Sequence, residues 1–299
     1  MKRFKRARLA NGVATILVES GQFEMNPHFD ETNDQQFRLC GHTGPEAELE
    51  SVLKWYGGDG TFVESPYFSG EFHPRIWRGP ESPSPDDAGL RQEWITSVRI
   101  GRQLFGRLRE LFSFVEPHSN NSATHGMQQR ELLMLACTEV ESAWKSILKA
   151  NGISKKNDRW TTSDFARLIA PMRIAEWTVS ISAHQGFGAF APFGSWTKDQ
   201  PTQSLPWYDA YNAVKHDREN AIEHATFANV VHAMGALFVM TVAQFGIRHL
   251  ETESPFHPDE FRLISTPAWN LNELYISPLK SINMEWLGFD KWTPSNCTM

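Results

Sequence analysis

The sequence predicts an α+β protein, with a mainly helical C-terminal bundle and a small β-rich N-terminal unit. Residues 1–85 hold short apolar runs separated by Gly, Pro and Asp, as between short strands. Residues 86–250 hold long stretches with apolar side chains at every third or fourth position, as in helices. Residues 251–299 return to Pro and aromatic residues, so we expect an irregular C-terminal tail packed on the bundle.

Four short segments of the N-terminal unit are predicted to be strands, because apolar and aromatic residues dominate them and turn residues bound them. They cover residues 13–18, 36–40, 61–68 and 71–77. The basic residues at 2–8 indicate the entry into a first strand, since the apolar run that follows is too short and broken for a signal peptide.

Two long helices are predicted next. Apolar residues recur along one helical face of 87–114 and along one face of 128–149, and Gly152 follows the second as a stop signal. A shorter helix is expected from Ser163 to Ile169, with Ser163 and Asp164 at its start. On the first helix a solvated basic face is expected, formed by Arg91, Arg99, Arg102 and Arg109.

Residues 184–206 are predicted to form a long loop, which its aromatic residues indicate is packed. The loop contains GFGAFA at 186–191, a match to a dinucleotide-binding pattern, but Pro192 follows where that pattern needs a helix. The longest helical signal comes next, over 207–245, and a strand is predicted at 261–265.

Composition excludes several classes of function. The chain has 29 Lys and Arg against 35 Asp and Glu, a net charge of −6, which does not support binding of nucleic acid through bulk positive charge. Three distant cysteines predict neither a disulfide framework nor a metal cluster and suggest a reducing cytoplasm. No apolar run approaches the ~18 residues of a membrane span, so we expect a cytoplasmic protein without membrane contact.

A polar stripe stands out within 207–245. Four of its residues recur at spacing four, which places them along one side of a helix. Histidine and asparagine are mediocre helix formers, and an idle exposed face more often carries Glu, Lys, Gln or Ala. The stripe therefore indicates a polar site, while a plain solvent-facing side and a buried network that fixes helix packing stay open as alternatives. Its members are Asn212, Lys215, His216, Asn220 and His224.

The run WYDAYNAVKHDR at 207–218, followed by an Ala-rich apolar helix, resembles the HEPN superfamily of small helical domains in prokaryotic toxins and phage-defence proteins. The resemblance covers about residues 125–250. The short signal of that family is an Arg, four to six residues and a His, which Arg218 and His224 match with five residues between them. Glu219 stands where Asn, Asp or His is commoner.

The resemblance implies a metal-independent endoribonuclease that acts as a homodimer, a toxin or defence effector without cofactors. RNA would be the substrate, and the β-rich unit would respond to a trigger or to a regulatory partner protein. Arg218 would orient the phosphate, and His224 or His216 would move protons. Asn212, Lys215 and Asn220 would position the substrate. The alternative is a non-catalytic HEPN-like module that binds a partner protein or a nucleotide through the same stripe.

The chemistry suits these residue types. An imidazole with an ordinary pKa near ~6.5 can take or give a proton at neutral pH, and a guanidinium matches the geometry of a phosphate. On one straight helix, however, Arg218 and His224 would lie about 240° apart. Long side chains, a local break in the helix or a second copy of the chain must bring them to one phosphate.

Overall fold

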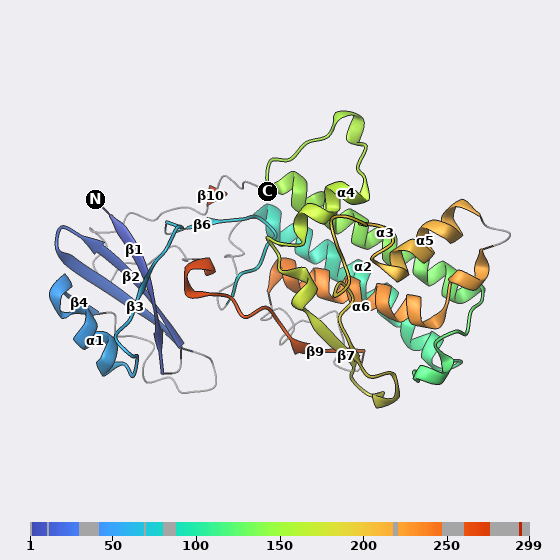
Figure 1. Ribbon diagram of the computed structural model, residues 1–299, viewed down its shortest axis with the longest axis horizontal. Helices are drawn as coiled ribbons and strands as arrows, with labels where there is room; N and C mark the ends of the chain where they lie inside the picture. Colours follow the sequence, from blue (N-terminus) through green and yellow to red (C-terminus); the bar gives the residue numbers. More distant parts are fainter. Residues whose placement is uncertain are drawn as a thin grey trace. The chain divides into compact units, whose positions relative to one another are not determined.

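The α+β class is confirmed by the computed structural model, which has antiparallel strands in the N-terminal part and helices in the C-terminal part (Figure 1). The chain divides into two compact units. Unit 1 takes the described residues within Met1–His73, Arg78–Ser84 and Ala268–Ser295, and unit 2 those within Pro74–Trp77 and Pro85–Pro267. The structure describes residues 2–10, 12–29, 42–68, 70–79, 88–217, 221–246, 260–275 and 293–294.

Unit 1 is built on an antiparallel sheet in the order β4-β3-β2-β1-β5. A two-residue turn joins its two longest strands, with Glu19 paired to Gln22. Ser20 and Gly21 in that turn have φ of 53° and 77°, the left-handed pair that matches the twist of a hairpin. The strands are β1 Arg3–Leu9, β2 Gly12–Glu19, β3 Gln22–Phe29, β4 His42–Pro45 and β5 Val63–Glu64.

Helix α1 (Leu49–Trp55) packs its apolar side on this sheet. Leu49 and Leu53 are fully buried there against alternate residues of the three central strands, such as Ala7 and Ile16. The alternation follows from the two-residue period of a strand, which places every second side chain on the same face. A second, parallel pair joins β6 (Glu71–Phe72) to β10 (Thr293–Pro294).

The strand predictions are confirmed in part. Residues 13–18 lie within β2, but only β5 forms inside 61–68 and only β6 inside 71–77. The last strand is short because the chain passes at Pro74 from unit 1 into unit 2. The strand predicted at 36–40 lies outside the described residues.

Unit 2 is centred on three helices that pack against one another, with α5 (Pro206–His216) against two of them (Figure 1). The two long helices predicted at 87–114 and 128–149 are confirmed, and Gly152 has the left-handed φ of 78° expected just past a helix end. The three central helices are α2 Ala88–Phe112, α3 Met127–Ala150 and α6 Phe227–Phe245.

The predicted basic face of α2 is exposed at Arg99 and Arg102. Arg109 is also exposed, but its guanidinium forms an ion pair with Glu260, whose side chain is buried. The prediction of a solvated face therefore holds at Arg99 and Arg102, while Arg109 serves to hold the segment before β9 (Phe261–Ser265) and the side chain of Arg91 lies outside the described part of the chain.

Smaller elements complete unit 2. Helix α4 (Thr162–Phe165) starts one residue earlier than predicted, because Thr161 and Asp164 form a capping box, and it ends before the predicted Ile169, where a 3₁₀ turn over Ala166–Leu168 replaces it. Strands β7 (Thr178–Ile181), β8 (Ala189–Phe190) and β9 form an antiparallel sheet in the order β8-β7-β9. Strand β9 confirms the strand predicted at 261–265.

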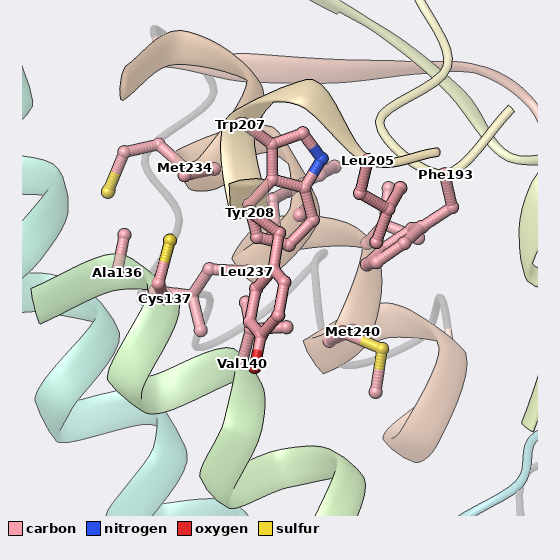
Figure 2. Close-up of a cluster of buried hydrophobic side chains, with 14 of the residues drawn as sticks. Ala136, Cys137, Val140, Phe193, Leu205, Trp207, Tyr208, Met234, Leu237 and Met240 are labelled. Atoms are coloured by element: carbon pink, nitrogen blue, oxygen red, sulfur yellow. The ribbon is translucent and has the colours of Figure 1, made fainter. Parts of the chain in front are cut away.

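The segment 184–206 is packed, as its aromatic residues predicted. Phe193 and Trp196 are buried, and both lie against the fully buried Trp144 of α3. The predicted loop is interrupted within GFGAFA, where Gln185–Phe187 form a 3₁₀ turn and Ala189–Phe190 form β8, and no helix follows the pattern as dinucleotide binding would require. Figure 2 shows the core that results, where α5 and this segment meet α3 and α6 through Ala136, Cys137, Val140, Phe193, Leu205, Trp207, Tyr208, Met234, Leu237 and Met240.

Helix α6 has the length and composition of a membrane span, with a mean hydropathy of 1.4, and is the one such helix among the described residues. However, 83% of that stretch is buried inside the protein. Its neighbours α2, α3 and α5 cover it, so the packing of unit 2 already accounts for its apolar composition.

Candidate functional site

The structure departs from the single helix predicted over 207–245. Helix α5 ends at His216, because Asp217 has φ −126° and ψ 89°, outside the helical region. Helix α6 begins after Thr226, whose hydroxyl accepts a hydrogen bond from the Asn229 backbone N–H at 3.2 Å. The prediction of one unbroken helix is therefore wrong, since a capping residue starts a separate helix ten positions after the first one ends.

The break changes the geometry of the stripe. A 3₁₀ turn, η7 (Ile222–His224), lies between the two helices and packs against α5. The 240° separation applied to a straight helix, so it does not apply to residues on the two sides of this break. A local break was one of the three ways that could bring Arg218 and His224 together. Arg218 and Asn220 themselves lie outside the described residues.

The two stripe histidines are exposed, His216 at the end of α5 and His224 at the end of η7. Neither imidazole makes a hydrogen bond or an ion pair with a residue that the structure describes. His224 is held through its backbone, whose N–H donates to the Ala221 carbonyl at 3.1 Å and whose carbonyl accepts from Nδ2 of Asn229 at 2.9 Å. Both rings are therefore available to a ligand, unlike the buried members of a packing network.

Lys215 is held in place beside His216. Its Nζ donates a hydrogen bond to the Tyr211 hydroxyl at 3.0 Å and lies 4.9 Å from the centroid of that ring. The hydrogen bond to Tyr211 raises the pKa of Lys215, while its partial burial opposes the rise. Lys215 is therefore a fixed cation at neutral pH. The carbonyl end of α5 favours this positive charge as well.

Tyr208 and Glu141 anchor α5 to α3, and the sequence analysis did not single out either. The Tyr208 hydroxyl donates to Oε1 of Glu141 at 2.5 Å. Burial, followed by this bond, raises the pKa of Tyr208, so the hydroxyl keeps its proton as a donor. The sequence could have indicated Tyr208, because it lies three residues before Tyr211 and therefore on the same helical face. Asn212, half-buried, completes the polar side of α5.

Cys137 lies in the apolar cluster of Figure 2, which also contains Tyr208 and Val140. Burial raises the pKa of the Cys137 thiol well above its ordinary value. Because the Cys137 side chain is fully buried among apolar residues, we assign it to packing. Within the described ranges, no three His, Cys, Asp or Glu side chains come together as metal ligands.

Comparisons with family models, with curated proteins and with solved structures found no match. The HEPN resemblance therefore stays a prediction that depends on the run at 207–218 and on the Arg218–His224 spacing. What the geometry contributes is a break between two helices, with exposed imidazoles at His216 and His224 on its two sides and a fixed cation beside one of them.

Proposed function

We propose that this protein is a metal-independent endoribonuclease of the HEPN-like type, with its site at the connection between α5 and α6. One observation supports this above the others: the exposed imidazoles of His216 and His224 flank a short connection that carries Arg218 in its sequence. The connection from Asp217 to Ala221 can span at most about 14 Å, so the cationic and imidazole groups belong to one small region.

The reaction needs two proton transfers and one fixed positive charge. One imidazole takes the proton of the ribose 2′-hydroxyl as this oxygen attacks the adjacent phosphorus. The other imidazole gives a proton to the 5′-oxygen as it leaves, which produces a 2′,3′-cyclic phosphate and a free 5′-hydroxyl. Arg218 and Lys215 balance the charge that develops on the phosphorane oxygens.

The remaining stripe residues would position the substrate. Asn212 is half-buried on α5 and Asn220 lies in the connection, and an amide can both donate to a phosphate oxygen and accept from a sugar hydroxyl. Because attack uses the 2′-hydroxyl, the proposed site cleaves RNA and not DNA without reading the bases. A second copy of the chain, a regulatory partner protein and a role as a toxin or defence effector belong to the same proposal.

An RNA-cleavage assay in EDTA tests this function with the full-length chain. Arg218→Ala and His224→Ala should each lower the rate by about 10²–10⁴-fold, the range expected for loss of an acid–base or charge-stabilising group. His216→Gln should do the same if His216 is the second proton carrier. A substrate with 2′-deoxyribose at the cleaved position should remain intact.

His42→Gln is the matched control, because His42 lies in β4 of unit 1, outside the proposed site. Its rate should equal that of the unmodified chain. Cleavage that persists in both Arg218→Ala and His224→Ala would rule out the proposal, and loss of cleavage on chelation alone would indicate a metal site. Binding of RNA without cleavage would favour the non-catalytic module.

A further inference from the structure

A cavity of about 260 Å³ lies within unit 2, away from the α5–α6 connection. Side chains from α2, α3 and α6 line it, together with Arg75 from the segment Pro74–Trp77. Its volume exceeds the roughly 150 Å³ of an engineered cavity that binds benzene, so it has room for a small metabolite. Most of its polar groups come from residues far apart in the sequence.

Arg75 is only 6% exposed, and side chains from α2 and α6 hold its guanidinium. Its Nε donates to Oε1 of Gln244 at 2.8 Å, and Nη1 lies 3.3 Å from Oε2 of Glu93. The backbone N–H of Trp77 donates to the Ala243 carbonyl at 2.8 Å, which fixes the segment Pro74–Trp77 on α6. Arg75 adopts φ +60°, a left-handed conformation that a bulky residue keeps only when its surroundings impose it.

The guanidinium of Arg75 has donors to spare. Nη1 forms an ion pair with Glu93 that lacks hydrogen-bond geometry, and Nη2 makes no hydrogen bond with a residue in the described part of the chain. A buried cation with unused donors is costly, and an acceptor that enters the cavity would offset this cost. A carboxylate fits best, because it can accept from both Nη atoms in the paired geometry that guanidinium groups favour.

The opposite charge comes from Glu139 and Glu93. Glu139 is half-buried on α3, and its carboxylate has no hydrogen bond or ion pair with a described residue. Burial raises the pKa of Glu139, as expected for a carboxylate without a compensating partner. Ser142 and Ser146 follow it on the same helical face, at spacings of three and four, and also line the cavity.

The charges select the class of ligand. One guanidinium and two carboxylates line the cavity, so it offers a partner both for a negative and for a positive group of a ligand. No aromatic side chain is among the described residues that line the cavity, which removes a stacking surface for a nucleobase. A small molecule with separate positive and negative groups can pair with Arg75 and with the two carboxylates at the same time.

We infer that this cavity binds a free α-amino acid, with its carboxylate on the Nη atoms of Arg75 and its ammonium group between Glu139 and Glu93. The hydroxyls of Ser142 and Ser146 can accept from the ammonium group or donate to the carboxylate. This inference is independent of the proposed ribonuclease activity, because the cavity shares no residue with the α5–α6 connection.

Thermal unfolding of the full chain tests the inference, with each standard L-amino acid added separately. A ligand that binds only the folded state raises the midpoint as its concentration increases. At least one free amino acid should raise the midpoint and give a saturable signal in calorimetry. Its N-acetyl derivative and the amine that lacks its carboxylate should bind at least about tenfold more weakly, a difference of ~1.4 kcal/mol.

Glu139→Gln is the decisive variant, because it keeps the shape of the side chain and removes the charge. We expect it to weaken binding at least about tenfold with no loss of stability, and Arg75→Gln to abolish binding. Glu131→Gln, at an exposed position on the same helix outside the cavity, should bind as the unmodified chain does. The inference fails if no amino acid binds, if the N-acetyl form binds equally well, or if Glu139→Gln has no effect.

Discussion

Helices α5 and α6 come from a single apolar signal over 207–245, yet they have opposite environments. Sixteen of the nineteen residues of α6 are buried, so its polar side chains must find partners inside the protein. Thr241 donates to the Leu237 carbonyl and Gln244 to the Met240 carbonyl, each four residues back. Helix α5 buries one side and leaves Lys215 and His216 exposed at its end.

The difference teaches that the same residue type has a different role on each helix. His232 on α6 stacks on the Phe190 ring, with centroids 4.4 Å apart, and serves the core. His216 and His224 have free rings and belong to the proposed site. A histidine therefore indicates function here only where the packing leaves its imidazole unpartnered.

The largest expected effect tests whether α5 is anchored as firmly as α6. Trp207 is 1% exposed, and its Nε1 donates to the Pro192 carbonyl at 2.8 Å. Trp207→Ala should lower the free energy of unfolding by about 3–5 kcal/mol, because it leaves a large cavity and an unpaired carbonyl. Urea denaturation measures this, with Trp55→Ala as the control, since Trp55 is 72% exposed. A loss below about 1 kcal/mol would show that α5 is only loosely attached.

The next effect distinguishes the half-buried His232 from the exposed histidines by the pH dependence of stability. Burial lowers the pKa of His232 to about 4, from 6.5. The unfolded chain therefore binds the proton more readily, so the stabilisation present above pH 6.5 is lost as the pH falls through about 4. The free energy of unfolding of His232→Gln should therefore fall by up to about 3 kcal/mol less between pH 7 and pH 4 than that of the unmodified chain.

Urea denaturation at pH 7 and pH 4 measures the difference between the unmodified chain and this variant. His216→Gln is the control, because an exposed imidazole without a partner contributes little to the free energy of unfolding. Equal pH dependence in the unmodified chain and His232→Gln would contradict the comparison between the two environments.

The smallest effect concerns polar groups. Gln244→Leu removes the acceptor for Nε of Arg75 and should cost about 1–3 kcal/mol, because a buried donor loses its partner. His224→Gln should change the free energy of unfolding by less than about 0.5 kcal/mol, since its ring contacts water. Chemical denaturation of both variants, in parallel with the unmodified chain, tests this ordering. Equal losses would mean that the two polar sites are buried alike.

Local patterns were sufficient for the long helices and for the strands at 13–18 and 261–265. Periodic apolar residues and end signals such as Gly152 act within a few residues, so they can be read from the sequence. The same patterns hid the break after His216, because apolar and helix-forming residues continue on both sides of it. Thr226 was the available signal for a new helix start.

The sequence by itself determined the class, the two-part order and the polar stripe, because these depend on neighbours along the chain. Tertiary structure alone decided which polar groups are buried and which are free. Arg75, Glu139 and Gln244 lie far apart in the sequence and line one cavity only because α3, α6 and the segment Pro74–Trp77 pack together. Contacts of this kind depend on how helices dock, and no local pattern encodes that docking.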